Sequence, residues 1–396
     1  MISFNKDILS IKFQSFINSS LNDEISTLVL KGIPFSNLEA KKVIEQIEAK
    51  KRCKTKLTSW YNTDQIYYPN KLNIEQTSSE TTANYKANLI KGKSIIDLTG
   101  GFGVDCFSFS KTFSQVTHCE INPILSEIVK HNFKQLKTTN ITCIATNGIE
   151  ALKTTKNSFD WIYIDPSRRS DIKGKVFLLN DCLPNVPKHL KDLFKKSNNI
   201  MIKTSPLLDI SSGISELSHV KTIHIVALNN EVKELLWILE KDYLGDIDIK
   251  TVNIKNNLET NFNFNLVEES TNEANYSVPL TYLYEPNVAI LKAGAFNVLG
   301  TKLDVKKLHK HSHLYTSSRL IVFPGRSFKI INKLPYNKKA FKKAFKEPKA
   351  NITTRNFPDK VDVIRKKLNL KDGGNSYIFF TTDLNDAKII LVCEKV

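Results

Sequence analysis

The sequence predicts an α/β protein with a doubly wound core, a helical region before it and a small α+β domain after it. Short apolar segments alternate with helical segments between residues 94 and 228, which is typical of a parallel sheet covered on both faces. A helical pattern precedes this stretch, and glycine- and proline-punctuated alternating segments follow it. We therefore expect four parts, at residues 1–85, 86–275, 276–320 and 321–396.

The first part is expected to be helical. Residues 38–51 place apolar side chains at helical spacing with charged residues between them. Further along, Ser78 or Ser79 is a suitable N-cap for a helix that runs to about Ile90.

The core is expected to contain six short strands separated by helices. The predicted strands are 94–98, 115–120, 141–145, 160–165, 199–204 and 222–228. Helices are expected between most of them, notably over 123–136 and 231–240, and residues 246–270 are expected to pair as strands around a polar turn. Right-handed crossovers would make this a Rossmann-like domain, in which ligands bind at the carboxyl ends of the strands.

Composition and charge narrow the functional classes. No apolar run approaches the roughly 20 residues needed to span a bilayer, and the N-terminal residues have no signal-peptide pattern. The six cysteines are scattered without CxxC spacing, so we expect free thiols, a cytoplasmic protein and no metal framework. The formal net charge of +17 favours a polyanionic partner such as RNA. The alternative is that the many lysines only form a solvated surface.

The segment DLTGGFG, residues 97–103, lies where the first predicted strand turns into a helix. Glycines there allow tight turns and let a ligand approach the backbone, but the GxGxxG spacing of a dinucleotide site is absent. An acidic residue followed by Gly-Gly-x-Gly resembles the first motif of class I methyltransferases, which faces the amino-acid part of S-adenosylmethionine. The candidate cofactor-binding residues are Asp97, Thr99, Gly100, Gly101 and Gly103. A glycine turn in an unrelated α/β fold is the alternative.

Two further candidates follow the next two strands. Glu120 ends the second strand, where a carboxylate can accept bonds from both ribose hydroxyls, although it could also be a helix-capping residue. Asn147 follows the third strand, where methyltransferases often place an acidic or amide side chain against the adenine amine. An ordinary Asn-Gly turn explains Asn147 equally well.

The segment DPSRR, residues 165–169, follows the fourth strand and resembles the [N/D]-P-P-[Y/F/R] loop of nucleic-acid methyltransferases. In that loop the carboxylate or amide oxygen and the following carbonyl accept hydrogen bonds from the nitrogen that is methylated, which aligns it with the methyl group. The candidate catalytic residues are Asp165, Pro166, Arg168 and Arg169, and Asp165 is also a cofactor candidate. Ser167 replaces the second proline, and no aromatic residue follows to stack on a base. The arginines could instead hold a phosphate or acidic substrate, or lie on the surface of a turn.

The positions of the cysteines and histidines disfavour methylation at pyrimidine C5 and metal binding. Methylation at C5 of a pyrimidine generally needs a cysteine after the fourth or fifth strand, and neither DPSRR nor Lys203-Thr204-Ser205-Pro206 contains one. Cys182 is the nearest and is expected in the core, so we predict methylation of nitrogen ahead of oxygen. The histidines of 309–313 have no accompanying Cys or acidic cluster, and we predict no metal site.

Together these motifs resemble a family of bacterial class I S-adenosylmethionine-dependent methyltransferases that end in a THUMP-like domain. The matching segments are EQTSSETTANYKA, DLTGGFGVD, DPSRR, KTSPLLD, EPNVAILKAG, FPGR, RNFP and KDGG. The resemblance spans nearly the whole chain and implies a class I core, a ferredoxin-like segment near 276–320 and a C-terminal THUMP-like domain. True THUMP domains bind RNA, which suits residues 321–396, where 17 basic residues face seven acidic ones.

Four functions are compatible with these motifs in different degrees. The first is methylation of an RNA base, in rRNA or tRNA, with the basic tail bound to the RNA backbone. The second is methylation of a protein or a small acidic metabolite clamped by Arg168 and Arg169. A noncatalytic RNA-binding protein is disfavoured because the candidate site residues are all present. A nicotinamide oxidoreductase is disfavoured by the glycine spacing.

Overall fold

The computed structural model describes residues 4–168 and 178–396, although not the side chains of Lys31, Asn37, Leu38 and Arg168. The chain divides into two compact units, 1–220 with 236–243, and 221–235 with 244–396. In the described ranges no helix is both long enough and apolar enough to cross a membrane.

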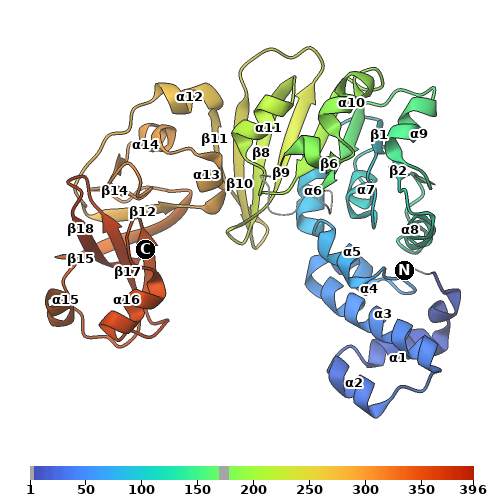
Figure 1. The fold of residues 1–396 in the computed structure, drawn as a ribbon, viewed down its shortest axis with the longest axis horizontal. Coiled ribbons are helices and arrows are strands. Elements are labelled where there is room, and N and C mark those ends of the chain that lie inside the picture. The colour runs from blue at the N-terminus through green and yellow to red at the C-terminus, as the bar shows by residue number, and fades with distance from the viewer. Residues whose placement is uncertain (1–3, 169–177) are drawn as a thin grey trace. The chain divides into compact units, whose positions relative to one another are not determined.

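The first unit begins with one long helix and several short ones gathered beside the core (Figure 1). Their bounds are Ile11–Ser19 (α1), Ile25–Lys31 (α2), Asn37–Lys56 (α3), Thr58–Asn62 (α4), Lys71–Gln76 (α5) and Glu80–Leu89 (α6). The helix predicted over 38–51 is confirmed by α3, and the predicted cap is confirmed because the Ser79 hydroxyl accepts a bond from the backbone N–H of Thr82 at the start of α6. Trp60 is completely buried, and its ring meets Phe102 and Phe107 at centroid distances of 6.0 and 4.8 Å.

One large sheet is built from nine strands in the order β11-β10-β8-β9-β7-β4-β1-β2-β3. The bounds are Ser94–Asp97 (β1), Gln115–Cys119 (β2), Ile141–Ile144 (β3), Trp161–Ile164 (β4), Asn199–Thr204 (β7), Val220–Leu228 (β8), Glu231–Glu240 (β9), Asp248–Lys255 (β10) and Leu258–Asn265 (β11). β1 pairs in parallel with β2 on one side and with β4 on the other. The chain therefore winds in opposite directions from β1, which creates the switch point where ligands bind in doubly wound sheets.

Helices connect these strands as the sequence predicts, with one exception. The connecting helices are Val104–Phe109 (α7), Pro123–Gln135 (α8), Gly148–Thr154 (α9), Val186–Leu193 (α10) and Ile210–Glu216 (α11). Residues 231–240, predicted as a helix, form strand β9 instead. Asn229 and Asn230 both have positive φ, which makes a two-residue turn from β8 into β9. Hydrogen bonding to neighbouring strands thus overrides the local preference of EVKELLWILE for a helix.

The paired strands predicted over 246–270 are confirmed by β10 and β11, which run antiparallel. The sheet is consequently mixed rather than wholly parallel, because β9 and β11 both enter through tight turns.

The second unit contains another sheet, in the order β13-β14-β12-β15-β18-β17-β16. Its strands are Tyr282–Pro286 (β12), Lys306–Lys307 (β13), Tyr315–Ser317 (β14), Gly325–Pro335 (β15), Asn351–Arg355 (β16), Ser376–Thr382 (β17) and Lys388–Lys395 (β18). The helices of this unit are Leu266–Thr271 (α12), Val288–Ala293 (α13), Asn297–Leu303 (α14), Lys338–Ala344 (α15) and Val361–Leu368 (α16).

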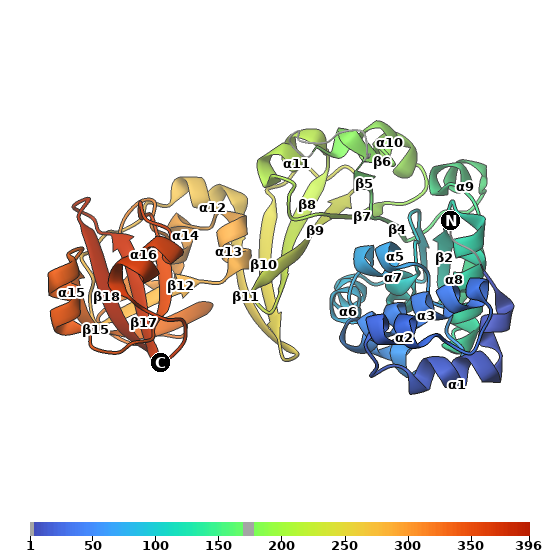
Figure 2. The same cartoon turned by 60° about the horizontal axis from the view of Figure 1, so that its bottom comes forward.

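Alternate residues of β17 and β18 build an apolar core on each face of this second sheet. Ile378 and Phe380 pack with Phe341 of α15 and Ile364 of α16, so both helices cover one face (Figure 2). Phe379 points to the opposite face, where a second cluster contains Leu283, Leu308, Phe328 and Leu391.

Candidate functional site

Four of the predicted site residues follow consecutive strands of the large sheet. Asp97 ends β1, Glu120 follows β2, Asn147 follows β3 and Asp165 follows β4. Since these strands are parallel, their carboxyl ends share one edge of the sheet. The structure thus brings these residues to the switch point, as the sequence analysis expects.

The glycine loop between β1 and α7 is crowded as well as sharply turned. Gly103 has φ of +81°, and a Cβ there would lie 2.6 Å from the ring of Phe133. A Cβ on Gly100 would lie 2.3 Å from the ring of His118, which is buried on β2. Both positions therefore require glycine, and the loop backbone follows a path that larger residues cannot adopt.

The Asp97 carboxyl group holds this loop from within. It is 1% exposed and accepts bonds from the Thr99 backbone N–H (2.8 Å) and hydroxyl (3.2 Å), while the Cys106 thiol lies 3.4 Å away. Burial raises the pKa of Asp97 to about 7. The hydrogen bond from the Thr99 N–H opposes this shift, and the nearby Asp105 carboxylate adds to it. Asp97 therefore fixes the loop conformation directly.

Glu120 binds the same loop from the next strand. Its Oε2 accepts the backbone N–H of Gly101 at 3.0 Å, and its Oε1 accepts the N–H of Asn122 at 2.8 Å. Asn122, not Glu120, caps α8, which removes the helix-capping interpretation of Glu120. Burial raises the pKa of Glu120, and these two N–H bonds oppose that shift.

Asn147 is the N-cap of α9. Its Oδ1 accepts bonds from the backbone N–H groups of Ile149 (2.9 Å) and Glu150 (3.4 Å), and the residue is exposed. The following Gly148 lies against β1, because a Cβ there would be 2.2 Å from the carbonyl oxygen of Leu98. The Asn-Gly pair thus has a structural role that is sufficient to explain it, and its contact with an adenine stays a prediction.

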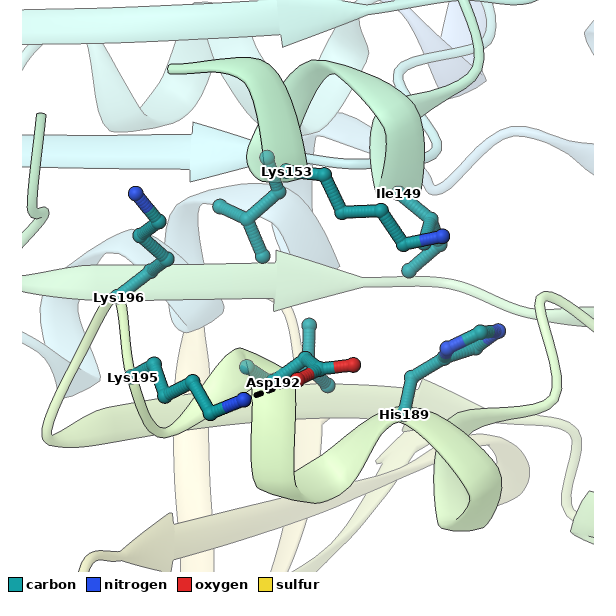
Figure 3. A pocket seen from close by; sticks show the side chains of 8 residues that line it. Ile149, Lys153, His189, Asp192, Lys195 and Lys196 are labelled. Atoms are coloured by element: carbon teal, nitrogen blue, oxygen red, sulfur yellow. Dashed lines mark hydrogen bonds and ion pairs between the residues drawn. The ribbon is translucent and has the colours of Figure 1, made fainter. Parts of the chain in front are cut away.

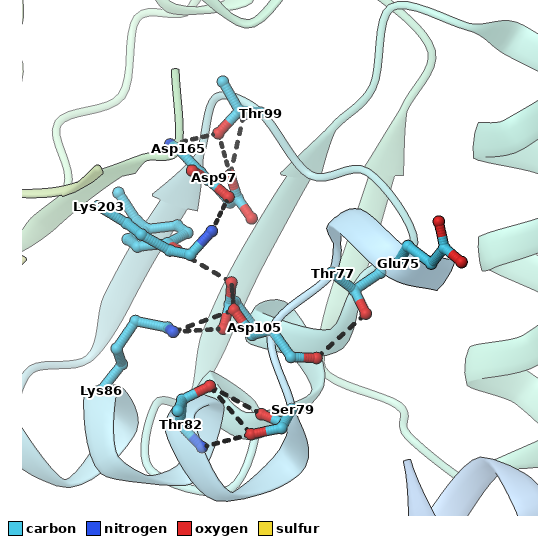
Figure 4. Close-up of polar contacts among 12 residues, drawn as sticks. Glu75, Thr77, Ser79, Thr82, Lys86, Asp97, Thr99, Asp105, Asp165 and Lys203 are labelled. Atoms are coloured by element: carbon cyan, nitrogen blue, oxygen red, sulfur yellow. Dashed lines mark hydrogen bonds and ion pairs between the residues drawn. The ribbon is translucent and has the colours of Figure 1, made fainter. Parts of the chain in front are cut away.

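Asp165 is joined to the glycine loop by Thr99. The Asp165 backbone N–H donates to the Thr99 hydroxyl at 2.7 Å, and the Asp165 carboxylate forms an ion pair with Lys203 at the end region of β7 (Figure 4). One hydroxyl therefore connects the DLTGG and DPSRR segments, which are 66 residues apart in the sequence. Lys203 was not among the predicted site residues; its place near the carboxyl end of a predicted strand, at the start of KTSPLLD, is the sequence signal that could have found it.

The rest of the DPSRR segment is only partly described. Ser167–Arg168 forms the short strand β5, which pairs antiparallel with β6, Cys182–Leu183. The side chain of Arg168 and the whole of Arg169 lie outside the described residues. Cys182 is completely buried, as expected for a core residue.

A buried polar cluster under the loop was also missed by the sequence analysis. Lys86 of α6 has no exposed surface, donates to the Ser78 hydroxyl at 3.0 Å and lies 3.2 Å from the Asp105 carboxylate. The other Asp105 oxygen accepts bonds from Tyr163 (2.9 Å) and Ser78 (3.0 Å). Both charged residues occur in motifs noted in the sequence, EQTSSETTANYKA and DLTGGFGVD, but helical periodicity alone cannot show that they pair.

A separate pocket of about 320 Å³ lies between α9 and α10 (Figure 3). It is lined by Ile149, Leu152, Lys153, His189, Asp192, Leu193, Lys195 and Lys196. None of the predicted site residues lines this pocket, and its lysines bind neighbouring groups, Lys195 with Asp192 and Lys196 with the carbonyl of Thr155.

The histidine segment 309–313 belongs to the second unit. His309 contacts Asp386 at 3.0 Å and Asn356 at 2.9 Å. Over residues 4–168 and 178–396, no group of three or more His, Cys, Asp and Glu side chains is arranged to hold a metal ion.

The chain has a doubly wound sheet and a glycine loop fixed by the acidic residue that ends β1. A carboxylate follows β2, and an Asp-Pro segment follows β4. This combination defines a class I methyltransferase. The crystal structure of a "putative methyltransferase" from Porphyromonas gingivalis W83 is 30% identical to this chain, covers 100% of both chains and has a TM-score of 0.90. The chain therefore belongs to the family of class I S-adenosylmethionine-dependent methyltransferases that end in a THUMP-like domain.

Family models match three consecutive segments. Residues 69–222 match "Conserved hypothetical protein 95", residues 282–324 a ferredoxin-like domain and residues 325–395 a THUMP domain-like model. Among other structures, that of M. capricolum TrmK in complex with S-adenosyl-homocysteine is 18% identical over 42% of this chain and 70% of its own, with a TM-score of 0.33. An rRNA methylase from Streptococcus thermophilus is 13% identical over 41% of this chain and 94% of its own, with a TM-score of 0.30. No curated protein matches the chain.

Proposed function

We propose that this methyltransferase transfers a methyl group from S-adenosylmethionine to a nitrogen of a base in RNA. The observation that supports this most directly is the connection of Asp165 to the glycine loop through Thr99, with Lys203 paired to the Asp165 carboxylate. A carboxylate of this kind, held next to the cofactor loop, is suited to orient an amino group toward a methyl donor.

The cofactor would lie along the loop of residues 99–103. Gly101, where the nearest atom to a Cβ would be 3.8 Å away, leaves bare backbone for the methionine part. Glu120 would accept the ribose hydroxyls with the lone pairs that Gly101 and Asn122 do not use. Asn147 would contact the adenine. These residues fit S-adenosylmethionine, which supplies a methyl group on a positively charged sulfur.

On the acceptor side, Asp165 and the carbonyl of Pro166 would accept hydrogen bonds from the amino group of the base. Lys203 pairs with Oδ2 of Asp165, and Oδ1, which has no hydrogen-bond partner among the described residues, would accept from the substrate. In the transfer a nitrogen–carbon bond forms as the carbon–sulfur bond breaks, and the nitrogen loses a proton to solvent or to Asp165. Arg168 and Arg169 would hold a phosphate next to the target base.

RNA is favoured as the substrate by charge and by the C-terminal domain. The chain has a net charge of +17, and residues 325–395 match a THUMP domain-like model.

The test is methyl transfer from labelled S-adenosylmethionine to total RNA from a strain that lacks the gene. We expect label in that RNA but not in wild-type RNA, which is already modified, and digestion then identifies the base. An Asp165→Ala enzyme should transfer no label, whereas Asp192→Ala, a change of an exposed aspartate on α10, should be fully active.

Absence of label in RNA despite cofactor binding would contradict the RNA assignment. Label in protein or in a small acidic metabolite would then identify the substrate class, and methyl–carbon bonds at pyrimidine C5 would contradict nitrogen chemistry.

A further inference from the structure

We propose that Arg326 and Arg355, held by the buried carboxylate of Glu285, form a phosphate-binding site in the second unit, and that an RNA backbone supplies the phosphate. The choice of RNA rests on the proposed function. The existence of the site rests on the geometry of these three residues and their neighbours in the second unit.

Glu285 is 5% exposed and is bound by both arginines. Its Oε2 accepts the Arg326 Nε–H at 2.7 Å, and its Oε1 accepts bonds from Arg355 Nη2 at 2.9 Å and Nε at 3.2 Å. One carboxylate thus fixes the two guanidinium planes through different oxygens. Each arginine is pre-organised, so little side-chain entropy remains to be lost when a ligand binds.

The three residues come from segments that are far apart in the sequence. Glu285 and Arg326 are direct cross-strand partners on β12 and β15, whereas Arg355 ends β16, at the far edge of the same sheet. Because Arg355 nevertheless contacts Glu285, the sheet must curl so that its edge strand returns to β12. The site therefore includes three motifs singled out in the sequence, Glu-Pro-Asn, Phe-Pro-Gly-Arg and Arg-Asn-Phe-Pro.

Both arginines retain donors for a ligand. Their bonds to Glu285 and to Thr353 use Nε and Nη2, and among the described residues no hydrogen bond engages either Nη1 group. The side chains of Arg326 and Arg355 are 40% and 33% exposed, so an anion can reach them. Two guanidinium groups against one carboxylate leave one positive charge in excess, which favours a phosphate over a neutral ligand.

A buried hydroxyl beside Arg355 lacks a partner in the described structure. Thr381 has no exposed surface, and its Oγ1 makes no hydrogen bond among the described residues. It is the direct partner of Arg355 in the parallel β16–β17 pair, so the two side chains leave the same face of the sheet. A buried hydroxyl without a partner is costly, so Thr381 places an unsatisfied polar group beside Arg355, on the face where the phosphate would bind.

The surroundings of Arg355 are positive as well. Burial lowers the pKa of His313 to about 4, and the charges of Lys307, Arg355 and His311 lower it further. Lys307 is itself 3% exposed.

Footprinting with phenylglyoxal on the full chain tests the site directly, because the chain has only seven arginines. We expect RNA to protect Arg326 and Arg355 from modification, as read by peptide mass spectrometry, and to leave the exposed Arg319 reactive. A nucleoside mixture without phosphate should protect neither. Equal labelling of both arginines with and without RNA would overturn the site, and equal protection by inorganic phosphate at the same phosphate concentration would overturn RNA as the source.

A double variant, Arg326→Lys with Arg355→Lys, provides a second measurement. It keeps the charges but loses the planar fork, so we expect RNA affinity to fall about tenfold while the salt dependence of binding stays the same. Arg319→Lys is the matched control and should bind as the wild type does. Unchanged affinity in a folded double variant would overturn the proposal, and the footprint decides the question if that variant does not fold.

Methyl transfer measured on the same RNA separates this inference from the proposed function. Methylation of RNA without protection of Arg326 and Arg355 refutes the phosphate site alone. Protection without methylation of any RNA supports the phosphate site and refutes the proposed function.

Discussion

Asp165 is held at both its backbone and its side chain, by partners from two different segments. Thr99 fixes the backbone N–H through its hydroxyl, and Lys203 pairs with the carboxylate. Sequence spacing predicted Asp165 because it follows a strand of a parallel sheet. It did not predict Lys203, because a lysine near a strand end has no distinguishing pattern until the carboxylate opposite it is known.

Replacing Lys203 with Met should lower kcat for methyl transfer by about 10²-fold. Without its cation the Asp165 carboxylate can rotate, and a displacement of about 1 Å at a reacting group costs about this factor. Steady-state kinetics of Lys203→Met measure the effect, with Lys195→Met as the control because Lys195 pairs with Asp192 on the surface. Equal kcat in the two variants would show that Lys203 does not position Asp165.

Asp97 should make the first unit less stable as the pH rises. Its folded pKa of about 7 exceeds its ordinary value, so between about pH 4 and pH 7 the unfolded chain is ionised while the folded chain still binds the proton. The free energy of unfolding of the wild type should therefore decrease across this window relative to Asp97→Asn, by at most about 1.4 kcal/mol per pH unit.

Urea denaturation followed by tryptophan fluorescence measures this difference, since the three tryptophans, Trp60, Trp161 and Trp237, all belong to the first unit. A parallel pH dependence in the two proteins would contradict the raised pKa of Asp97.

At the scale of elements, the loop between β1 and α7 allows the cost of backbone strain to be separated from the cost of side-chain crowding. Gly101 and Gly103 both have positive φ, but only Gly103 is crowded; the nearest atom to a Cβ on Gly101 is 3.8 Å away. Gly101→Ala should cost about 1 kcal/mol of unfolding free energy from backbone strain, and Gly103→Ala about 2–4 kcal/mol, because the ring of Phe133 must also move. Urea unfolding of both variants checks this order. A larger loss of unfolding free energy in Gly101→Ala than in Gly103→Ala would contradict this conformation of the loop.

The hairpin of β8 and β9 shows where the residue pattern alone does not predict the type of element. Residues 231–240 combine helix-forming residues with an apolar run, and the sequence prediction of a helix is wrong there. The two asparagines before it, both with positive φ, were the local signal for a tight turn. By contrast, strands such as β1 and β7 are flanked by glycine or asparagine and were located to within one residue.

At the scale of the whole molecule, charge should dominate the binding of RNA. With a net charge of +17, the Kd for RNA should rise at least about tenfold between 50 and 200 mM salt, because bound cations are released from the RNA on binding. Fluorescence anisotropy with labelled RNA over a salt series measures the slope. Binding that does not weaken with salt would contradict a partner held through its phosphates.

The sequence alone determined the class of fold, the positions of most core strands, and the glycine loop and Asp-Pro segment of the site, because these depend on local periodicity and on the shared edge of parallel strands. Only the tertiary structure decided what holds these residues: Thr99 between the two motifs, Lys203 on Asp165, Lys86 beneath the loop, and Glu285 between Arg326 and Arg355. These contacts join residues that are far apart in the sequence, the largest separation being the 70 residues between Glu285 and Arg355. Their partners are chosen by packing and burial, which a one-dimensional pattern does not contain.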